Sequence, residues 1–203
     1  MNLLIVTLFS YIAGSIPFGL ILGKIFGKID IRKIGSGNIG ATNVLRTGNK
    51  LLAGATLVLD IVKGYVPVMI TMEYFPEFVQ LSCLTVFLGH LFPIWLKFKG
   101  GKGVATYLGI LFALSIQLAS LFIFTWVLVS LIFKYSSLSS MFSSLTVLVV
   151  AVIKETALSS IGMHANFEKN IILMLFIFFI LIIFTHRKNI LSLKNKTEQK
   201  IKI

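Results

Sequence analysis

Long apolar runs recur along the whole chain, and they constrain its fold more than any other feature. A hydrocarbon core about 30 Å thick needs roughly 20 apolar residues for each helical crossing. Runs that approach or exceed this length cover residues 3–25, 51–72, 78–96, 104–133, 138–153 and 171–185. Of the 203 residues, 57% are hydrophobic, and the mean hydropathy is +0.95. We therefore expect an all-α integral membrane protein with a single domain over residues 1–203.

The run over residues 104–133 decides the topology, because 30 residues in one helix would reach about 45 Å. If the run crosses the membrane twice, turning near Gln117, then 16 of the 19 Lys and Arg residues share one side. If it crosses once, the basic tail moves to the outer face, against the positive-inside tendency. We therefore expect seven transmembrane helices, with the N-terminus outside and the C-terminus cytoplasmic. The outer side then carries Glu73, Glu77, Glu155 and Glu168.

Two of these helices are expected to be short. Residues 104–116 and 138–153 would reach only about 20 to 24 Å. Such helices thin the bilayer or stop short of one face. We hypothesise that they surround a cleft that faces the cytoplasm.

The net charge of +12 reports this topology rather than a nucleic-acid partner. The single cysteine, Cys83, lies in an apolar run, so neither a disulfide framework nor a cluster of thiol metal ligands is expected. The first 13 residues carry no basic side chain. This favours a retained first span over a signal peptide.

The polar segment from Gly35 to Arg46 has the composition of an anion-binding loop. Glycine lets backbone N–H groups approach a phosphate, while hydroxyl, amide and guanidinium groups donate hydrogen bonds to it. A flexible solvated turn is the alternative. The G-x-G-x-x-G spacing within this segment does not indicate a dinucleotide site, because no βαβ unit surrounds it.

A second segment, residues 89–106, also predicts a phosphate site. Three glycines surround Lys102 where a helix is expected to begin, which brings N–H groups, a helix dipole and an ammonium to one point. A basic loop that contacts lipid head groups is the alternative. His90 could donate to phosphate, act as a general base or be a buried imidazole. Trp95 occupies the position where a His-x-x-x-x-Asp acyltransferase would have its Asp.

Three further features are polar groups close to or inside the spans. Asp60 and Lys63 share a helix face in the second run, where each must be paired or solvated, and we favour a structural pair over substrate contact. The serines of residues 134–140 suit either helix capping or ligand binding. The tail from His186 to Glu198 is either a topological signal or part of the same inner face.

With these segments in order, the chain resembles the bacterial glycerol-3-phosphate acyltransferases that use acyl phosphate and have seven membrane helices. The resemblance rests on Gly14 to Pro17, Gly35 to Arg46, Asp60 to Gly64, Gly89 to Thr106 and His186 to Glu198. It implies acyl transfer to the 1-hydroxyl of glycerol 3-phosphate, giving lysophosphatidate and phosphate without coenzyme A, carrier protein, metal or other cofactor. It also implies a monomer in the bacterial inner membrane, with the active site on the cytoplasmic side.

The family's functional residues map onto matching positions of this chain. The expected catalytic residues are Ser36, Arg46, His90 and Lys102. The expected substrate-binding residues are Gly37, Asn38, Gly40, Thr42, Asn43, Lys97, Gly100, Gly101, Gly103, Ser137, Ser140, His186, Asn189 and Glu198. The family works without a protein nucleophile, and no Ser-His-Asp or Cys-His set is visible in this sequence.

The rival interpretation is a transporter for a phosphorylated or anionic solute, because glycine-broken segments and intramembrane charges also occur at transport sites. We favour the enzyme because the expected phosphate segments lie on one face rather than at the membrane midplane. No inverted repeat is visible in the hydropathy.

Overall fold

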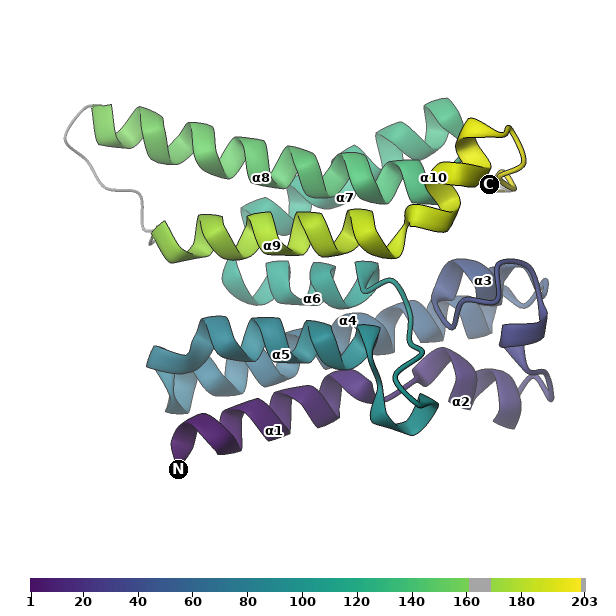
Figure 1. Cartoon of the computed structure of the whole chain (residues 1–203), viewed down its shortest axis with the longest axis horizontal. Coiled ribbons are helices and arrows are strands. Elements are labelled where there is room, and N and C mark those ends of the chain that lie inside the picture. Colours follow the sequence, from purple (N-terminus) through teal and green to yellow (C-terminus); the bar gives the residue numbers. More distant parts are fainter. Residues whose placement is uncertain (161–168, 202–203) are drawn as a thin grey trace. The chain divides into compact units, whose positions relative to one another are not determined.

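The computed structural model describes residues 1–160 and 169–201, and over these ranges it is helical without a strand. Glu168, one of the acids expected on the outer side, lies outside the described residues. The chain divides into two compact units, Met1–Ser115 and Ile116–Ile203. Figure 1 labels the helices: α1 Asn2–Ser15, α2 Phe18–Ile25, α3 Ala41–Leu45, α4 Lys50–Tyr74, α5 Val79–Leu91, α6 Val104–Leu114, α7 Ile116–Phe133, α8 Ser136–Ser160, α9 Lys169–Thr185 and α10 Arg187–Lys194.

The prediction of an all-helical chain with several apolar spans is confirmed. Within the part of the chain that the structure describes, five segments are long and apolar enough to cross a membrane: Asn2–Ile25, Lys50–Tyr74, Pro76–Leu96, Ile116–Phe133 and Ser136–Leu158. A sixth is the pair Ile171–Thr185 and Arg187–Lys194, bent by 56° at the junction of α9 and α10. Helix α6, Val104–Leu114, is a shorter apolar helix.

Helix breaks fall where the backbone cannot continue a helix. Pro17 has no N–H and restricts the residue before it, so Ile16 is extended and separates α1 from α2. Close to the turn expected near Gln117, the helix breaks at Ser115, whose backbone is extended between α6 and α7.

One of the two predictions of a short helix is wrong. Helix α8 continues past Ile153 to Ser160 and has 25 residues, or about 37 Å. Lys154 and Glu155 ended the apolar run in the sequence, but a helix end is set by backbone hydrogen bonding rather than by hydropathy. Helix α6 is short as expected, with 11 residues.

Glycines bring the helices of unit 1 into close contact. Helix α1 packs on α5, and α4 packs on α6. A Cβ on Gly14 would overlap the carbonyl group of Val86, and one on Gly64 would overlap the carbonyl group of Thr106. Gly109 approaches α4 in the same way, against the carbonyl of Ile61. Small residues permit such backbone approaches in membrane helix pairs, where packing replaces the hydrophobic effect.

Unit 2 contains α7, α8, α9 and α10, with α8 in contact with both α7 and α9. The indole N–H of Trp126 on α7 donates to the hydroxyl of Ser140 on α8, at 3.2 Å. The chain after α10 returns to the start of α8, where the N–H of Ile201 donates to the carbonyl of Lys134 at 2.7 Å. This hydrogen bond holds the C-terminal segment against the end of the unit that carries the serines of residues 134–140.

Two glycines of α4 provide a matched test of this packing. Gly64→Ala should destabilise the protein by about 1–3 kcal/mol, because its Cβ has no room against α6. Gly54→Ala should be neutral or stabilising by up to about 1 kcal/mol, because nothing lies within 4 Å of its Cβ position. Thermal unfolding of both variants in one detergent measures the difference, and equal melting temperatures would contradict the close α4–α6 contact.

Candidate functional site

Asn43 holds the first predicted phosphate loop together. It is buried in α3, and its side-chain Nδ2 contacts the carbonyl oxygens of Ile31, Ile34 and Asn38 at 2.8, 3.0 and 2.8 Å. Its Oδ1 accepts from the N–H of Ser36 at 3.0 Å and from the Ser36 hydroxyl at 3.2 Å. The polar atoms of this side chain are therefore engaged by the loop itself, which gives Asn43 a structural role that the sequence did not predict.

The backbone of the same loop also bonds internally. The N–H of Gly37 donates to the carbonyl of Ile34 at 2.9 Å, and the N–H of Gly40 donates to the Asn38 side chain at 3.2 Å. Gly35 and Gly37 have φ values of +54 and +70, which favour glycine. These glycines shape the loop, and the amides expected to surround a phosphate instead hold its turns.

Side chains, rather than backbone amides, are the groups that this loop offers to a ligand. Ser36 is exposed, and Thr42 and Arg46 are partly buried. The Nη1 of Arg46 lies 3.4 Å from Asn43 Oδ1, a long contact that uses one edge of a guanidinium with five N–H donors. Arg46 thus remains suited to a two-pronged contact with phosphate.

Another arginine of this region, Arg32, is already paired with a carboxylate. Arg32 donates to both carboxylate oxygens of Asp30, at 2.9 and 2.6 Å. This contact holds the pKa of Asp30 well below its usual range and raises the pKa of Arg32. Arg32 therefore offers less charge to a ligand than Arg46 does.

The second predicted phosphate segment folds back on the end of α5. The N–H of Gly100 donates to the carbonyl of Leu91, and that of Gly101 donates to the carbonyl of His90, both at 3.1 Å. Gly103, with φ +82, is the N-cap of α6, and no side chain caps this helix. Lys102 is partly buried directly before it. The anion-binding feature here is the N-terminus of α6 with Lys102, because two glycine amides are engaged elsewhere.

His90 lies buried beneath this segment. Its Nδ1 is 3.0 Å from the hydroxyl of Thr106, and a Cβ on Gly101 would overlap its Nε2. Of the three roles left open by the sequence, the geometry favours the buried imidazole, which supports the glycine segment from below.

Asp60 and Lys63 form a buried ion pair at 2.7 Å, which confirms that the two charges are paired. The Lys63 ammonium also donates to the carbonyl of Ile16 at 2.7 Å, beside the break that Pro17 causes. His90 Nδ1 lies 4.0 Å from Asp60 Oδ1. The pair thus connects the α1–α2 break with the imidazole under the glycine segment.

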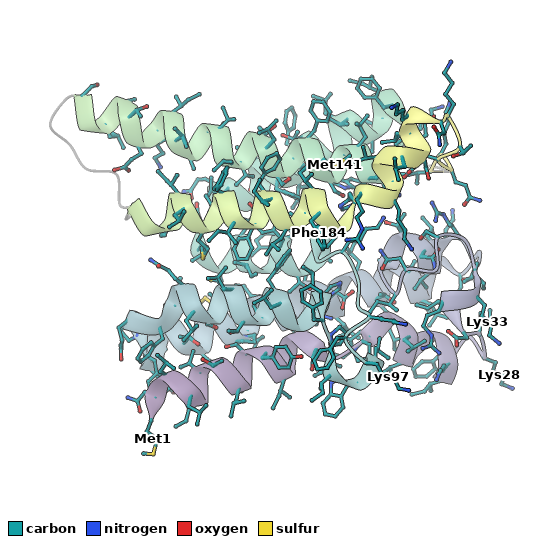
Figure 2. The ribbon with its side chains drawn as sticks, viewed as in Figure 1. Met1, Lys28, Lys33, Lys97, Met141 and Phe184 are labelled. Atoms are coloured by element: carbon teal, nitrogen blue, oxygen red, sulfur yellow. The ribbon has the colours of Figure 1, made fainter. Side chains whose placement is uncertain are left out.

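The two predicted segments of unit 1 lie against one hydrophobic cluster. Ile39 and Val44 of the first segment belong to this cluster, as does Ile31 shortly before it, and Leu96 of the second segment packs against it. In Figure 2 the labelled lysines of this unit, Lys28, Lys33 and Lys97, lie away from Met1. The structure therefore brings both segments to the same end of unit 1.

In unit 2, Glu198 holds two of the predicted ligand-binding residues. Its carboxylate accepts from the Ser137 hydroxyl at 2.7 Å and from the Asn189 amide at 2.8 and 2.9 Å. These contacts join α8, α10 and the chain after α10. A carboxylate repels phosphate, so this position favours a supporting role for Glu198 over a substrate contact.

Two other predicted residues of unit 2 bond to backbone carbonyls four residues earlier in the chain. The Ser140 hydroxyl donates to the Ser136 carbonyl at 2.8 Å. The His186 ring contacts the carbonyl of Ile182 at 2.8 Å, so Nδ1 carries the proton in this bond and the other ring nitrogen faces elsewhere. Both side chains are buried.

Several supporting groups were not predicted from the sequence. Thr106 bonds His90, the Ile16 carbonyl accepts from Lys63, and the Ser15 hydroxyl accepts from the Trp95 indole at 2.8 Å. For the Ile16 carbonyl, Pro17 was the available signal. A proline inside an apolar run breaks the helix, and the backbone carbonyls exposed at the break need a donor. Among residues 1–160 and 169–201, no group of three or more His, Cys, Asp or Glu residues could hold a metal ion.

The family profile and the relatives that match this chain carry the same name. The profile of a family described as "Glycerol-3-phosphate acyltransferase" matches residues 4–196. Proteins with that name are similar to this chain: one from Pelagibacter ubique is 54% identical over 203 residues, all of both chains, and one from Mesorhizobium japonicum is 48% identical over 200 residues, 98% and 96% of the two chains.

Two solved structures have the same fold. Both are of PlsY, an integral membrane glycerol 3-phosphate acyltransferase. Its glycerol 3-phosphate form has a TM-score of 0.89 at 33% identity, and its lysophosphatidic acid form has 0.87 at 32%. Each comparison covers 100% of this chain and 96% of the other.

The ion pair under the glycine segment can be tested by a double-mutant cycle. Asp60→Asn or Lys63→Met alone should each cost about 3–5 kcal/mol of stability, because one charge is left buried without its partner. The double variant should cost less than either single variant. Thermal unfolding in detergent measures all four proteins. Additive losses would show that the two charges act independently.

Proposed function

Because the chain belongs to the glycerol-3-phosphate acyltransferase family, we propose that it transfers a fatty acyl group from acyl phosphate to the 1-hydroxyl of sn-glycerol 3-phosphate. The products are lysophosphatidate and inorganic phosphate, as in the first acylation of phospholipid synthesis. The proposal rests mainly on the similarity to this family over nearly the whole chain. That similarity includes both predicted phosphate segments of unit 1. The names of the similar structures, with glycerol 3-phosphate and lysophosphatidic acid, support the acceptor and the product.

Both proposed substrates carry a phosphate, and unit 1 offers two suitable groups of donors. Arg46 and Ser36 project from a loop that Asn43 holds in place. Lys102 stands at the uncapped N-terminus of α6. Donors fixed before the substrate arrives stabilise developing charge without reorganising during the reaction. We assign Ser36, Arg46 and Lys102 to substrate contact, and His90 and Asn43 to positioning.

In the proposed reaction, the 1-hydroxyl oxygen attacks the acyl carbonyl carbon. The bond between that carbon and the phosphate oxygen breaks, and the electron pair leaves with phosphate. The acceptor's own phosphate takes the hydroxyl proton, so no side chain has to act as general base, and the acceptor oxygen itself is the nucleophile. The only thiol, Cys83, is fully buried in α5, which is consistent with this route. Arg46 and Lys102 would stabilise the charge that develops on the carbonyl oxygen and the leaving phosphate.

The glycines and the polar residues of unit 2 complete the proposal. Gly37, Gly40, Gly100, Gly101 and Gly103 give the backbone turns that aim the donors. Ser137 and Asn189, which both donate to the Glu198 carboxylate, are assigned to substrate contact. The remaining predicted substrate-binding residues are Asn38, Thr42, Ser140 and His186.

We further propose seven spans in one membrane domain, which is a monomer in the bacterial inner membrane. The segment of α1 and α2 counts as one span, and α4, α5, α6, α7, α8 and α9 as the other six. The break at Ser115 and the charge bias support this assignment. It puts the N-terminus outside and the C-terminus, with a cleft that holds the active site, on the cytoplasmic side.

An activity assay tests the function directly. Purified protein in lipid should convert acyl phosphate and glycerol 3-phosphate to lysophosphatidate with release of phosphate. Arg46→Ala and Lys102→Ala should each lower turnover at least tenfold, about 1.4 kcal/mol of transition-state stabilisation. Arg32→Ala, just before the same loop, should change turnover less than twofold, because Arg32 is already paired with Asp30.

Two outcomes would contradict this proposal. Absence of product from folded wild-type protein would defeat the enzyme assignment, and solute uptake without product would favour a transporter. Equal losses in Arg46→Ala and Arg32→Ala would show that the loop tolerates no charge change, rather than that Arg46 binds phosphate.

Single cysteines test the topology in a Cys83→Ala background. Thiols at positions 33 and 195 should react with an impermeant reagent only from the cytoplasmic side, and one at position 73 only from outside. All three positions are exposed, so a missing label reports sidedness rather than burial. Labelling of position 195 together with position 73 would contradict an odd number of spans between them.

A further inference from the structure

The short segment between α5 and the glycines, residues 92–99, forms an exposed surface that the proposed function does not use. We call it the aromatic loop. Its large apolar side chains lie outward, with Phe92 39% exposed, Ile94 52%, Trp95 60% and Phe98 58%. Lys97 and Lys99 are exposed beside them. Figure 2 labels Lys97, which lies in this loop.

The aromatic loop is held in place by specific hydrogen bonds. The Trp95 indole donates to the Ser15 hydroxyl at 2.8 Å, and the Tyr11 hydroxyl donates to the Phe92 carbonyl at 2.7 Å. The N–H of Phe98 donates to the Pro93 carbonyl at 3.0 Å. Because the polar atom of Trp95 is satisfied while its ring stays exposed, the ring itself needs an apolar neighbour.

The backbone of the loop adopts a conformation that side chains rarely accept. Lys97 and Phe98 have φ values of 51 and 61, in the left-handed region, and neither is glycine. Two such residues in succession persist only where the surrounding structure fixes them. A phenylalanine placed between two lysines in this way presents an apolar ring flanked by positive charge.

The chemistry of this surface fits a lipid leaflet. The apolar segment Pro76–Leu96 ends inside the loop, which puts the loop at the membrane boundary. Trp is enriched at this depth, and Lys reaches from it to head-group phosphates. No acidic residue occurs between Glu77 and Glu155, so no carboxylate of this stretch offsets the two lysines. The surface is also much smaller than the roughly 20 to 30 residues that each partner contributes to a stable protein interface.

We propose that the aromatic loop inserts into the head-group region of the leaflet and binds anionic phospholipid. Trp95, Phe98 and Ile94 contact the upper acyl chains, and Lys97 and Lys99 contact the phosphates. This proposal assigns Lys97 to lipid, in place of the substrate contact expected from the sequence. Because the loop continues directly into Gly100–Gly103, the same contact fixes the depth of the α6 N-terminus.

The two tryptophans allow the proposal to be tested by fluorescence. Trp126→Phe leaves Trp95 as the only tryptophan, and Trp95→Phe leaves Trp126, which lies near the middle of α7 along the chain. Each protein is placed in vesicles whose lipids carry bromine near the head-group end or near the methyl end of the acyl chain. Trp95 should be quenched most by bromine near the head groups, and Trp126 most by bromine near the methyl end.

Anionic lipid and the lysines give the second half of the test. Replacing phosphatidylcholine with phosphatidylglycerol should at least halve the quenching of Trp95 by aqueous acrylamide, and Lys97→Gln/Lys99→Gln should abolish this change. Lys194→Gln/Lys196→Gln removes the same charge from unit 2 and should preserve it. If Trp126→Phe reduces the yield of folded protein, native mass spectrometry of the chain with both tryptophans should show less bound phosphatidylglycerol after the Lys97 and Lys99 replacements.

The contradicting results are distinct from failure of the enzyme assay. Trp95 that is quenched by acrylamide and not by either brominated lipid lies in water, which would overturn insertion and favour a protein partner for this surface. A phosphatidylglycerol effect that survives in Lys97→Gln/Lys99→Gln would overturn the assignment of the lysines to head groups.

Discussion

A polar group placed in or beside hydrocarbon must find its partner within the protein, and the arrangement of this chain follows from that requirement. The Asp60–Lys63 pair, the Ile16 carbonyl and the His90 imidazole lie within one buried polar cluster of unit 1. In the loop that precedes α4, the Asn43 side chain is the polar partner of three backbone carbonyls. In each place a buried polar side chain has a structural partner, so rigidity near the membrane surface comes from polar contacts as well as from apolar packing.

This requirement separates two kinds of polar residue that look alike in a sequence. One kind forms a fixed framework, as Asn43 and Glu198 do with several contacts each. The other kind is oriented by that framework, as Arg46 and Ser36 are. For a reaction without a protein nucleophile, the second kind supplies charge at fixed points and the first kind keeps those points fixed, which is the condition for catalysis by positioning.

The sequence predicted the helical class, the position of most apolar segments and the break near residue 117, because hydropathy and length determine them. It also identified the two loops, from their glycines and cations. It could not assign the amides of Gly100 and Gly101, which bond to the end of α5. It could not show that Asn43 faces inward, because an amide side chain suits a ligand and a backbone carbonyl equally well. The end of α8 was misjudged because Lys154 and Glu155 interrupt the hydropathy without interrupting the helix.

Hydrogen exchange of the substrate-free protein in lipid nanodiscs tests the central claim that the loops are framed before any ligand binds. The amides of Ser36, Gly37, Gly40, Gly100 and Gly101 should exchange much more slowly than those of an unstructured peptide, because each donates to a protein acceptor. Asn43→Ala should remove the protection of Ser36, Gly37 and Gly40 and leave that of Gly100 and Gly101 intact. Exchange at the unstructured rate in the wild-type protein, slowed only by added glycerol 3-phosphate, would show that the substrate orders these loops and would contradict the account.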